Sequence, residues 1–317
     1  MRICRYELEG KAQAGFYFDD RIVPLAKAVE ACAKGGGKTA GLSVSDDLLR
    51  YLPGGAEHVA ARSVAAWLST HAESMPELSV AVGKVRLLTP IARPNKILLL
   101  AGNYAKHIEE GGGTAVERRK TFPYVFMKPG STTINHPDAP IAIPKVSPNH
   151  VDWECELAVV MGKRAKSVKE ADALAHVAGY MVINDVSDRE YRPNPQRQLR
   201  PKDTFFDWQH GKWHDGFCPA GPCIASADIL TDPQTLRLTL KLNGATKQDS
   251  NTSLQIFPVA AVIEFLSSFV TLEPGDIIST GTPAGVGHAT GTYLKPGDKM
   301  EAAIEGIGVL RNHMVAG

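Results

Sequence analysis

The sequence predicts an α+β fold in which strands outnumber helices. Two observations support this prediction. After residue 96, strand-like apolar runs follow one another directly, whereas helical patterns are fewer. The first 92 residues differ from the rest, because helical patches there alternate with a hairpin pattern. We therefore expect a small N-terminal α/β domain at residues 1–92, followed by a larger domain at residues 93–317.

The N-terminal elements follow from local patterns. Residues 16–24 predict a hairpin whose turn holds Asp19 and Asp20. Helices are predicted at residues 25–33 and 59–72. Three consecutive glycines, residues 35–37, predict a helix stop or a flexible turn. They are not read as a phosphate-binding loop, because the lysine and Ser/Thr of such a loop are not at the required spacing.

The larger domain begins with a short apolar strand and continues through runs that suit buried or half-buried strands. Leucines at every second position from Leu236 to Leu242 alternate with polar neighbours, which is typical of a strand with one buried face. Pro258 stands in the first turn of an amphipathic helix. In chain order, we predict strands at 97–100, 154–162, 177–183 and 236–242, a helix at 258–269, and strands at 277–280, 300–304 and 308–311.

Composition excludes several classes of protein. The chain has 317 residues and a net charge of +1, so nothing indicates binding to nucleic acid or an anionic membrane. No apolar run has the length of a membrane span or the form of a signal peptide, and we expect a cytoplasmic protein. The five cysteines include no CxxC pair, so we expect reduced thiols, and Cys218 with Cys223 is a weak candidate for zinc.

Three acidic residues indicate a metal site. Glu154 and Glu156 open a strand-like run, and alternate residues of a strand face the same side. Asp185 directly follows the next predicted strand. Adjacent carboxylates repel unless a cation or a proton lies between them. Mg²⁺ or Mn²⁺ suits such oxygen ligands, and Ca²⁺ accepts them as well. The alternatives are an edge strand with two solvated glutamates, and a turn or capping role for Asp185.

A histidine–glutamate pair is the candidate for proton transfer. His107 and Glu110 would share one face of a helical turn, and a carboxylate beside an imidazole raises its basicity and fixes its tautomer. Gly111–Gly113 follow, so residues 104–115 could close over a site as a lid. The alternative is a surface pair beside a flexible loop.

Two further positions could stabilise negative charge. Lys212 precedes an apolar segment rich in Pro and Gly, and it could point into a cleft towards an oxyanion or an enolate. The alternative is a solvated lysine. Thr282, in the loop after the strand at 277–280, could face an anion together with backbone N–H groups. That loop could equally be a tight turn.

Taken in chain order, these motifs resemble the fumarylacetoacetate hydrolase family. The resemblance covers about residues 97–317 and implies a mixed β-sandwich roll, usually dimeric, with the small leading domain of some bacterial members. It implies Mg²⁺ or Mn²⁺ held by Glu154, Glu156 and Asp185. It also implies that His107 and Glu110 activate a water on a lid, that Lys212 stabilises a carbanion or enolate, and that Tyr104 and Thr282 contact the substrate. The motifs are Asn103-Tyr104 with His107 and Glu110, Phe126-Met127-Lys128-Pro129, 154–162, Asn184-Asp185-Val186-Ser187, Lys212 with Cys218-Pro219, and Gly275–Ile278 with Gly281-Thr282-Pro283.

The sequence departs from the family pattern near the expected substrate. Gly102 stands where many relatives have Lys or Arg, and Asp188-Arg189-Glu190 replaces the usual Ala-Arg-Asp. Arg192 occupies a position that is often Gln. We predict Arg189 and Arg192 as substrate contacts, and Arg192 or Arg197 as a replacement for the missing cation.

The resemblance implies metal-dependent hydrolysis of a C–C bond in an acylpyruvate-like 1,3-diketo acid such as fumarylpyruvate, in the breakdown of aromatic compounds. The alternative chemistry uses the same metal–enolate site for oxaloacetate decarboxylation, or for isomerisation or hydration of a 2-hydroxymuconate-type dienoate. A third hypothesis is a non-catalytic binding protein that keeps the fold. It is disfavoured because the three metal carboxylates are all present.

Overall fold

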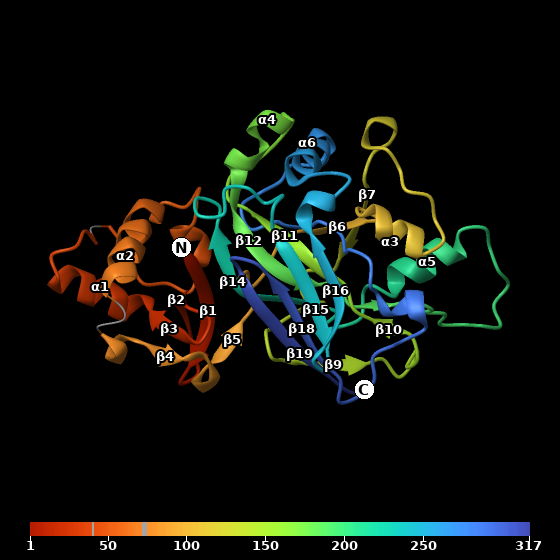
Figure 1. Ribbon diagram of the computed structural model, residues 1–317, viewed down its shortest axis with the longest axis horizontal. Coiled ribbons are helices and arrows are strands. Elements are labelled where there is room, and N and C mark those ends of the chain that lie inside the picture. Colours follow the sequence, from red (N-terminus) through yellow and green to blue (C-terminus); the bar gives the residue numbers. More distant parts are fainter. Residues whose placement is uncertain (40, 72–74) are drawn as a thin grey trace.

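Two large β-sheets form the framework of the computed structural model, which describes residues 1–39, 41–71 and 75–317 (Figure 1). The N-terminal part contains β1 (Arg2–Leu8), β2 (Lys11–Tyr17), β3 (Arg21–Pro24), α1 (Leu25–Lys34), α2 (His58–His71), β4 (Val80–Ala81) and β5 (Arg86–Leu88). The predicted hairpin and both helices are present. The predicted last residue of the second helix, Ala72, lies outside the described residues.

The remainder holds most of the strands and confirms the predicted α+β class. Its elements are β6 (Ile97–Ala101), α3 (Ala105–Glu110), β7 (Tyr124–Lys128), β8 (Ile134–Asn135), β9 (Pro140–Ile143), β10 (Val151–Asp152), β11 (Cys155–Met161), α4 (Glu170–Ala173), β12 (Val177–Asn184), β13 (Ser187–Asp188), α5 (Asp203–His210), β14 (Cys218–Ser226), β15 (Arg237–Leu242), β16 (Ala245–Asn251), α6 (Val259–Phe269), β17 (Ile277–Ser279), β18 (Lys299–Ile304) and β19 (Gly308–Ala316).

The larger sheet runs in the order β4-β3-β2-β1-β14-β12-β11-β17-β6-β7, with β5 beside β1 and β8 beside β14. The second sheet runs β16-β15-β18-β19-β9, and β10 pairs with β13 alone. Strand β11 is therefore central, antiparallel to both β12 and β17. The N-terminal strands are continuous with the rest of the large sheet, because β1 pairs with β14.

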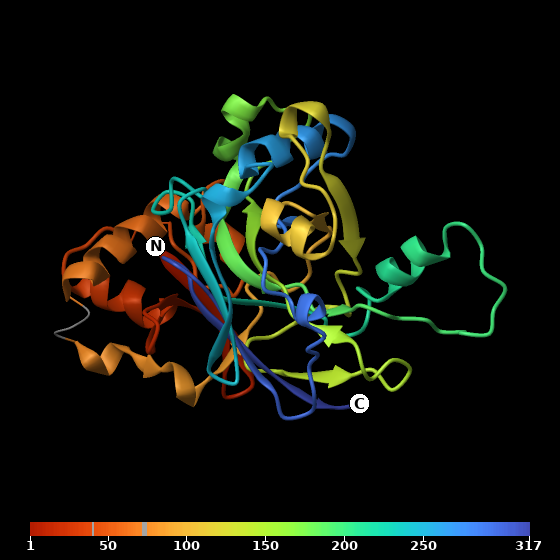
Figure 2. The ribbon, with the colours of Figure 1, turned by 45° about the vertical axis from the view of Figure 1, so that its right-hand side comes forward.

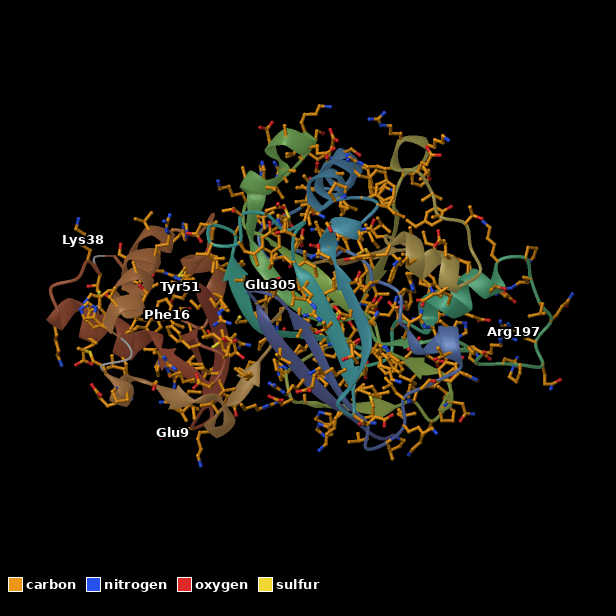
Figure 3. All side chains as sticks on the ribbon, in the orientation of Figure 1. Glu9, Phe16, Lys38, Tyr51, Arg197 and Glu305 are labelled. Atoms are coloured by element: carbon orange, nitrogen blue, oxygen red, sulfur yellow. The ribbon has the colours of Figure 1, made fainter. Side chains whose placement is uncertain are left out.

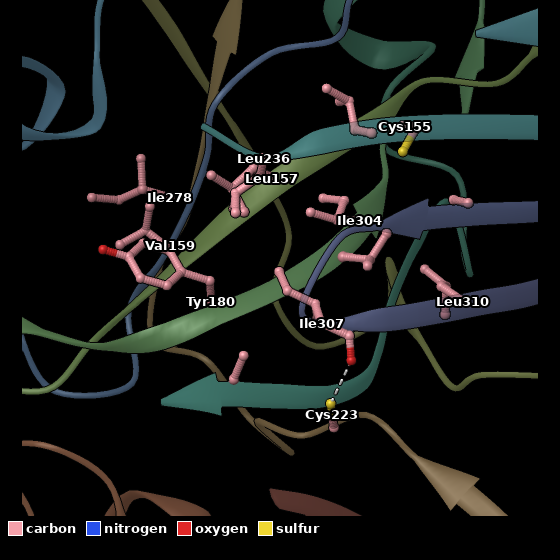
Figure 4. Close-up of a cluster of buried hydrophobic side chains, with 14 of the residues drawn as sticks. Cys155, Leu157, Val159, Tyr180, Cys223, Leu236, Ile278, Ile304, Ile307 and Leu310 are labelled. Carbon is pink, nitrogen blue, oxygen red and sulfur yellow. Dashed lines mark hydrogen bonds between the residues drawn. The ribbon is translucent and has the colours of Figure 1, made fainter. Parts of the chain in front are cut away.

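The core between the two sheets fixes which way β11 faces. Cys155, Leu157 and Val159 belong to the same buried cluster as Ile304 and Leu310 of the second sheet (Figure 4). Because strand residues alternate faces, the residues of β11 between these three, of which Glu156 is the first, face the opposite side of the large sheet. That opposite face of the large sheet positions the site.

Strand β14 was missed by the sequence patterns. It contains Pro219, Gly221 and Pro222, and proline is uncommon in a central strand because it cannot donate a ladder hydrogen bond. The segment is nonetheless fully buried between β1 and β12. The register between β12 and β14 shifts between Tyr180 and Val182, which accommodates the interrupted ladder.

Helices cover the ends of this framework. The N-terminal helices α1 and α2 lie beside the first strands, and α4 packs near α6 at the top of the view (Figure 1). The chain between β13 and α5 projects away from the body (Figure 2), and the labelled Arg197 marks its outer part (Figure 3). In the described part of the chain, no helix combines the length and apolar character needed to cross a membrane.

Candidate metal centre and active site

The three predicted acids meet at one end of the β11–β12 pair. Pairing of Cys155 with Asn184 brings Glu154 opposite Asp185, whose N–H donates to the Glu154 carbonyl at 2.9 Å. One carboxylate oxygen from each of Glu154, Glu156 and Asp185 lies within 4.8 Å of the others. All three residues are buried, with at most 4% exposure. The alternative of an edge strand with solvated glutamates is therefore wrong.

Two cations hold the Glu154 carboxylate. The Lys212 ammonium lies 2.8 Å from Glu154 Oε2 and 2.7 Å from Asp185 Oδ2. The Arg189 guanidinium lies 2.6 Å from Glu154 Oε1, and its Nε donates to Asp152 at 2.8 Å. Burial alone would raise the pKa of Glu154, but Arg189 and Lys212 outweigh it and lower the pKa to about 2.

The alternative of a solvated Lys212 is wrong, because this residue is only 3% exposed. Its ammonium lies 5.2 Å from the centre of the Phe126 ring and 5.8 Å from that of Trp208. Burial alone would lower the pKa of Lys212, but the carboxylates of Asp185 and Glu154 raise it, so the side chain stays a cation.

Glu156 is held by neutral donors. The Ser279 hydroxyl donates to its Oε2 at 2.5 Å, and the Gly281 N–H donates to the same oxygen at 2.9 Å. Gly281 has a φ of +87°, and a Cβ there would lie 2.9 Å from the Asn103 side chain, so glycine is required. Burial raises the pKa of Glu156, and the charges of Asp185 and Glu154 raise it further.

The donor chemistry fits a hard divalent cation. The cluster offers only carboxylate oxygens, and one of its members, Glu156, has no cation against it among the contacts of the described residues. A divalent ion would supply positive charge next to Glu156, which the cations against Glu154 and Asp185 do not contact.

The predicted histidine–glutamate pair lies beside these acids. His107 Nδ1 is 2.8 Å from Glu110 Oε1, and the Gly285 N–H donates to Glu110 Oε2 at 2.9 Å. Both side chains are half-buried and line cavities, so the pair is not a surface pair. Helix α3 positions them, and its first turn is anchored by the Asn103 side chain, which bonds Phe257 and the Thr280 carbonyl.

One cavity of about 240 Å³ collects these groups. It is lined by Leu100, Ala101, Gly102, His107, Phe126, Glu154, Glu156, Arg189, Trp208, Lys212 and Thr282. A second cavity of about 390 Å³ shares Gly102, His107 and Arg189 with the first and extends past Glu110 to His288. Glu154, Glu156, His107 and Lys212 therefore face one space that continues into the second cavity, and Asp185 lies beside it within the acid cluster.

Of the four predicted substrate contacts, Thr282 and Arg189 line a cavity, whereas Tyr104 and Arg192 do not. Thr282 lines the inner cavity, where its hydroxyl donates to the Cys155 carbonyl and accepts from Gln248. Arg189 lines both cavities. Tyr104 is buried against Gln255 and does not line either cavity. Arg192 is exposed on the projecting segment, and it is also not among the residues that line the cavities. The structure does not bring Arg192 to the position of the missing cation beside Gly102.

The sequence reasoning gave no role to two buried charges at the site, although Lys128 belongs to one of the quoted motifs. Lys128 contacts Asp185, and Asp152 accepts from Arg189 and from the N–H groups of Gly287 and His288. The signal for Lys128 was available, since it is a single lysine at the end of the apolar run 124–127. The candidate zinc pair Cys218 and Cys223 consists of free, buried thiols.

The comparisons with known proteins agree with this site. The family described as Fumarylacetoacetate (FAA) hydrolase C-terminal matches residues 96–315. The chain therefore belongs to the fumarylacetoacetate hydrolase family, a family of enzymes acting on ketonic substrates.

Particular relatives carry different activities. The chain is 39% identical over 234 residues to the mitochondrial oxaloacetate tautomerase FAHD2A of Bos taurus, covering 73% of this chain and 70% of that one. It is 36% identical over 277 residues to the 2,4-didehydro-3-deoxy-L-rhamnonate hydrolase of Sphingomonas sp. (strain SKA58), covering 86% and 91%. The structure of maleylpyruvate hydrolase from Sphingobium sp. SYK-6, in complex with manganese (II) ion and pyruvate, matches with a TM-score of 0.70 and 28% identity over 100% of both chains.

Proposed function

We propose that this protein is a divalent-metal-dependent hydrolase that cleaves a C–C bond in an acylpyruvate-like 2,4-dioxo acid. The observation that carries the proposal is the inner cavity, whose lining brings the Glu154 and Glu156 carboxylates together with His107 and Lys212, while a carboxylate oxygen of Asp185 lies within 4.8 Å of an oxygen of each glutamate. Such a set supplies a metal site, a base and a fixed cation, which are the parts that this reaction needs.

We propose that Glu154, Glu156 and Asp185 hold Mg²⁺ or Mn²⁺. The all-carboxylate donor set supports a hard cation, and the manganese of the maleylpyruvate hydrolase structure supports the same class of ion. When bound, such an ion polarises carbonyl oxygens and stabilises the negative charge that develops on them.

His107 would act as the general base. Its Nδ1 faces Glu110, which leaves Nε2 as the nitrogen that can take a proton from a water in the cavity. Glu110 would hold the imidazole in that tautomer and stabilise its positive charge after the transfer. The Gly285 N–H would keep the Glu110 carboxylate in place.

The bond changes balance without another reactant. The water oxygen bonds to the distal carbonyl carbon of the substrate as His107 takes the proton. The bond between that carbon and the CH₂ group then breaks, and its electron pair forms the enolate of pyruvate. Lys212, held as a cation by its carboxylate neighbours, would stabilise the enolate oxygen. The proton that His107 took from the water then passes to the CH₂ carbon, which gives pyruvate beside the released carboxylic acid and restores the neutral imidazole.

The relatives support a dioxo acid as the substrate class. The substrate named for the 36% identical hydrolase has carbonyl groups at carbons 2 and 4 on either side of a CH₂ group. That relation covers 86% of this chain, so it includes part of the N-terminal segment. Thr282 and Arg189, which line the cavity, would contact the oxygens of such a substrate.

The test is a parallel assay with acetylpyruvate, fumarylpyruvate and oxaloacetate, with product identification, before and after chelation and readdition of Mg²⁺ or Mn²⁺. We expect pyruvate plus a second acid from an acylpyruvate, dependent on metal and lost in Glu154→Gln. Turnover of an acylpyruvate that survives chelation and Glu154→Gln would contradict the proposal.

A non-hydrolytic reaction on oxaloacetate is the second candidate, because an oxaloacetate tautomerase is 39% identical to this chain. The same cavity could hold an enol or enolate without an activated water. Keto–enol interconversion or pyruvate release from oxaloacetate, with acylpyruvates left intact, would favour this candidate. A homodimeric state and a cytoplasmic location stay predictions, which light scattering and cell fractionation would test.

A further inference from the structure

We propose that Lys128 is a positioning residue for the metal centre, which holds one oxygen of Asp185 so that the other oxygen faces Glu154 and Glu156. The inference rests on the proposed metal-dependent function. Lys128 lies in β7, on a different part of the sheet from the acids, and neither the motif analysis nor the proposed mechanism gives it a role.

The contacts of Lys128 are fully internal. Its ammonium lies 2.5 Å from Asp185 Oδ1, and it donates to the carbonyls of Val186 at 2.8 Å and Phe217 at 2.5 Å. The two carbonyls accept hydrogen bonds from the ammonium, and its contact with Asp185 is an ion pair. The residue is 1% exposed, and its side chain does not line either cavity. Lys128 therefore does not reach the substrate and acts through Asp185.

The burial of the Lys128 ammonium needs a physical explanation. Burying an ammonium is costly even when it is paired, and an apolar side chain of similar length would fill the same space at the end of β7. The two carbonyl contacts hold the ammonium in one place, against the Asp185 oxygen that Lys212 does not contact. Lys128 is thus a fixed point against which the Asp185 carboxylate is oriented.

The other two acids are held in a comparable way. Arg189 contacts Glu154 Oε1, while Lys212 contacts Oε2. Ser279 and Gly281 both donate to Glu156 Oε2. Each acid therefore has at least one oxygen engaged by a group outside the cluster of carboxylates. Groups of this kind orient ligands to metals, and their loss commonly weakens metal binding about 10–100-fold.

The chain offers a matched control. Lys96 contacts the buried Asp276 at 2.8 Å, and the Asp276 carbonyl accepts from Met161, at the far end of β11 from Glu154. Replacing Lys96 also removes a lysine from a buried aspartate, but it leaves the metal centre untouched.

The experiment is a calorimetric titration of Mn²⁺ into metal-free wild type, Lys128→Met and Lys96→Met, with the unfolding midpoint of each measured in chelator. We expect Lys128→Met to bind Mn²⁺ about 10–100-fold more weakly than wild type. We expect Lys96→Met to bind Mn²⁺ with wild-type affinity, even if its unfolding midpoint falls as much as that of Lys128→Met. Lys128→Gln, whose amide ends one bond short of the ammonium, serves if the Met variant does not fold. A folded Lys128 variant that binds Mn²⁺ as tightly as wild type, or more tightly because a cation has gone, would overturn the inference. Wild type without Mn²⁺ affinity would instead refute the proposed function itself.

Discussion

Glu110 makes two contacts that together fix one imidazole. Its Oε1 faces His107 Nδ1 and its Oε2 accepts from Gly285. In Glu110→Gln the amide oxygen would stay with the Gly285 N–H, so the NH₂ group would face Nδ1. The proton of the imidazole would then move to Nε2, which could no longer accept one from water. We expect kcat for hydrolysis to fall about 10²–10⁴-fold, with metal affinity unchanged.

The neighbouring exposed Glu109 on the same helix is the control for this experiment. Glu109→Gln removes the same charge from α3 without touching His107, and we expect wild-type kcat. Equal losses in both variants would show that the general charge of α3, and not the tautomer of His107, controls the rate. Steady-state kinetics with an acylpyruvate, together with Mn²⁺ titration, measure both quantities.

At the scale of elements, the loop after β17 links the base to the second sheet. Gly285 has a φ of +102°, and a Cβ there would lie 2.1 Å from the Lys247 carbonyl of β16. Gly285→Ala must shift this loop, and with it the N–H that holds Glu110. We expect a loss of unfolding free energy of roughly 2–4 kcal/mol, from backbone strain and overpacking together, and a lower kcat.

Gly291 in the same loop allows a direct comparison. It also has a positive φ, of +65°, but a Cβ would meet nothing within 4 Å. Gly291→Ala should cost about 1 kcal/mol for the backbone alone and leave kcat unchanged. Denaturant unfolding and kinetics on both variants test this difference, and similar kcat values in the two would rule out the loop as the support of Glu110.

At the scale of the whole molecule, local patterns predicted the elements better than their arrangement. The spacing of Glu154 and Glu156 was enough to place both on one face of a buried strand, because that follows from the period of a strand. The pairing of strands across the sheet was not predictable, because the prolines of β14 are typical of a turn and not of a central strand. The contact of Arg189 with Glu154 was not predictable either, because it depends on the path that the chain takes after β13. Lys128 reaches Asp185 across 57 residues, which no local pattern encodes.

The predicted boundary at residue 92 is crossed by one continuous sheet. Ile3 pairs with Ile224, and the Ser226 N–H donates to the Met1 carbonyl at 2.9 Å. Buried side chains of β1, β2 and α1 share a cluster with those of β12 and β14, namely Ile3, Phe16, Leu25, Ala178 and Ile224. The N-terminal segment therefore covers the edge of β14 and part of its apolar face.

A fragment of residues 93–317 should consequently be much less stable than the full chain. It loses the partner strand of β14 and exposes several large apolar side chains, each worth about 1.5–3 kcal/mol when buried. We expect a Tm lower by roughly 10 °C or more, with increased binding of a hydrophobic dye, in calorimetry and fluorescence on both proteins without metal. A fragment that unfolds cooperatively at the midpoint of the full chain would show instead that residues 1–92 form an independent domain, whose pairing with β14 adds nothing to the stability of the catalytic part.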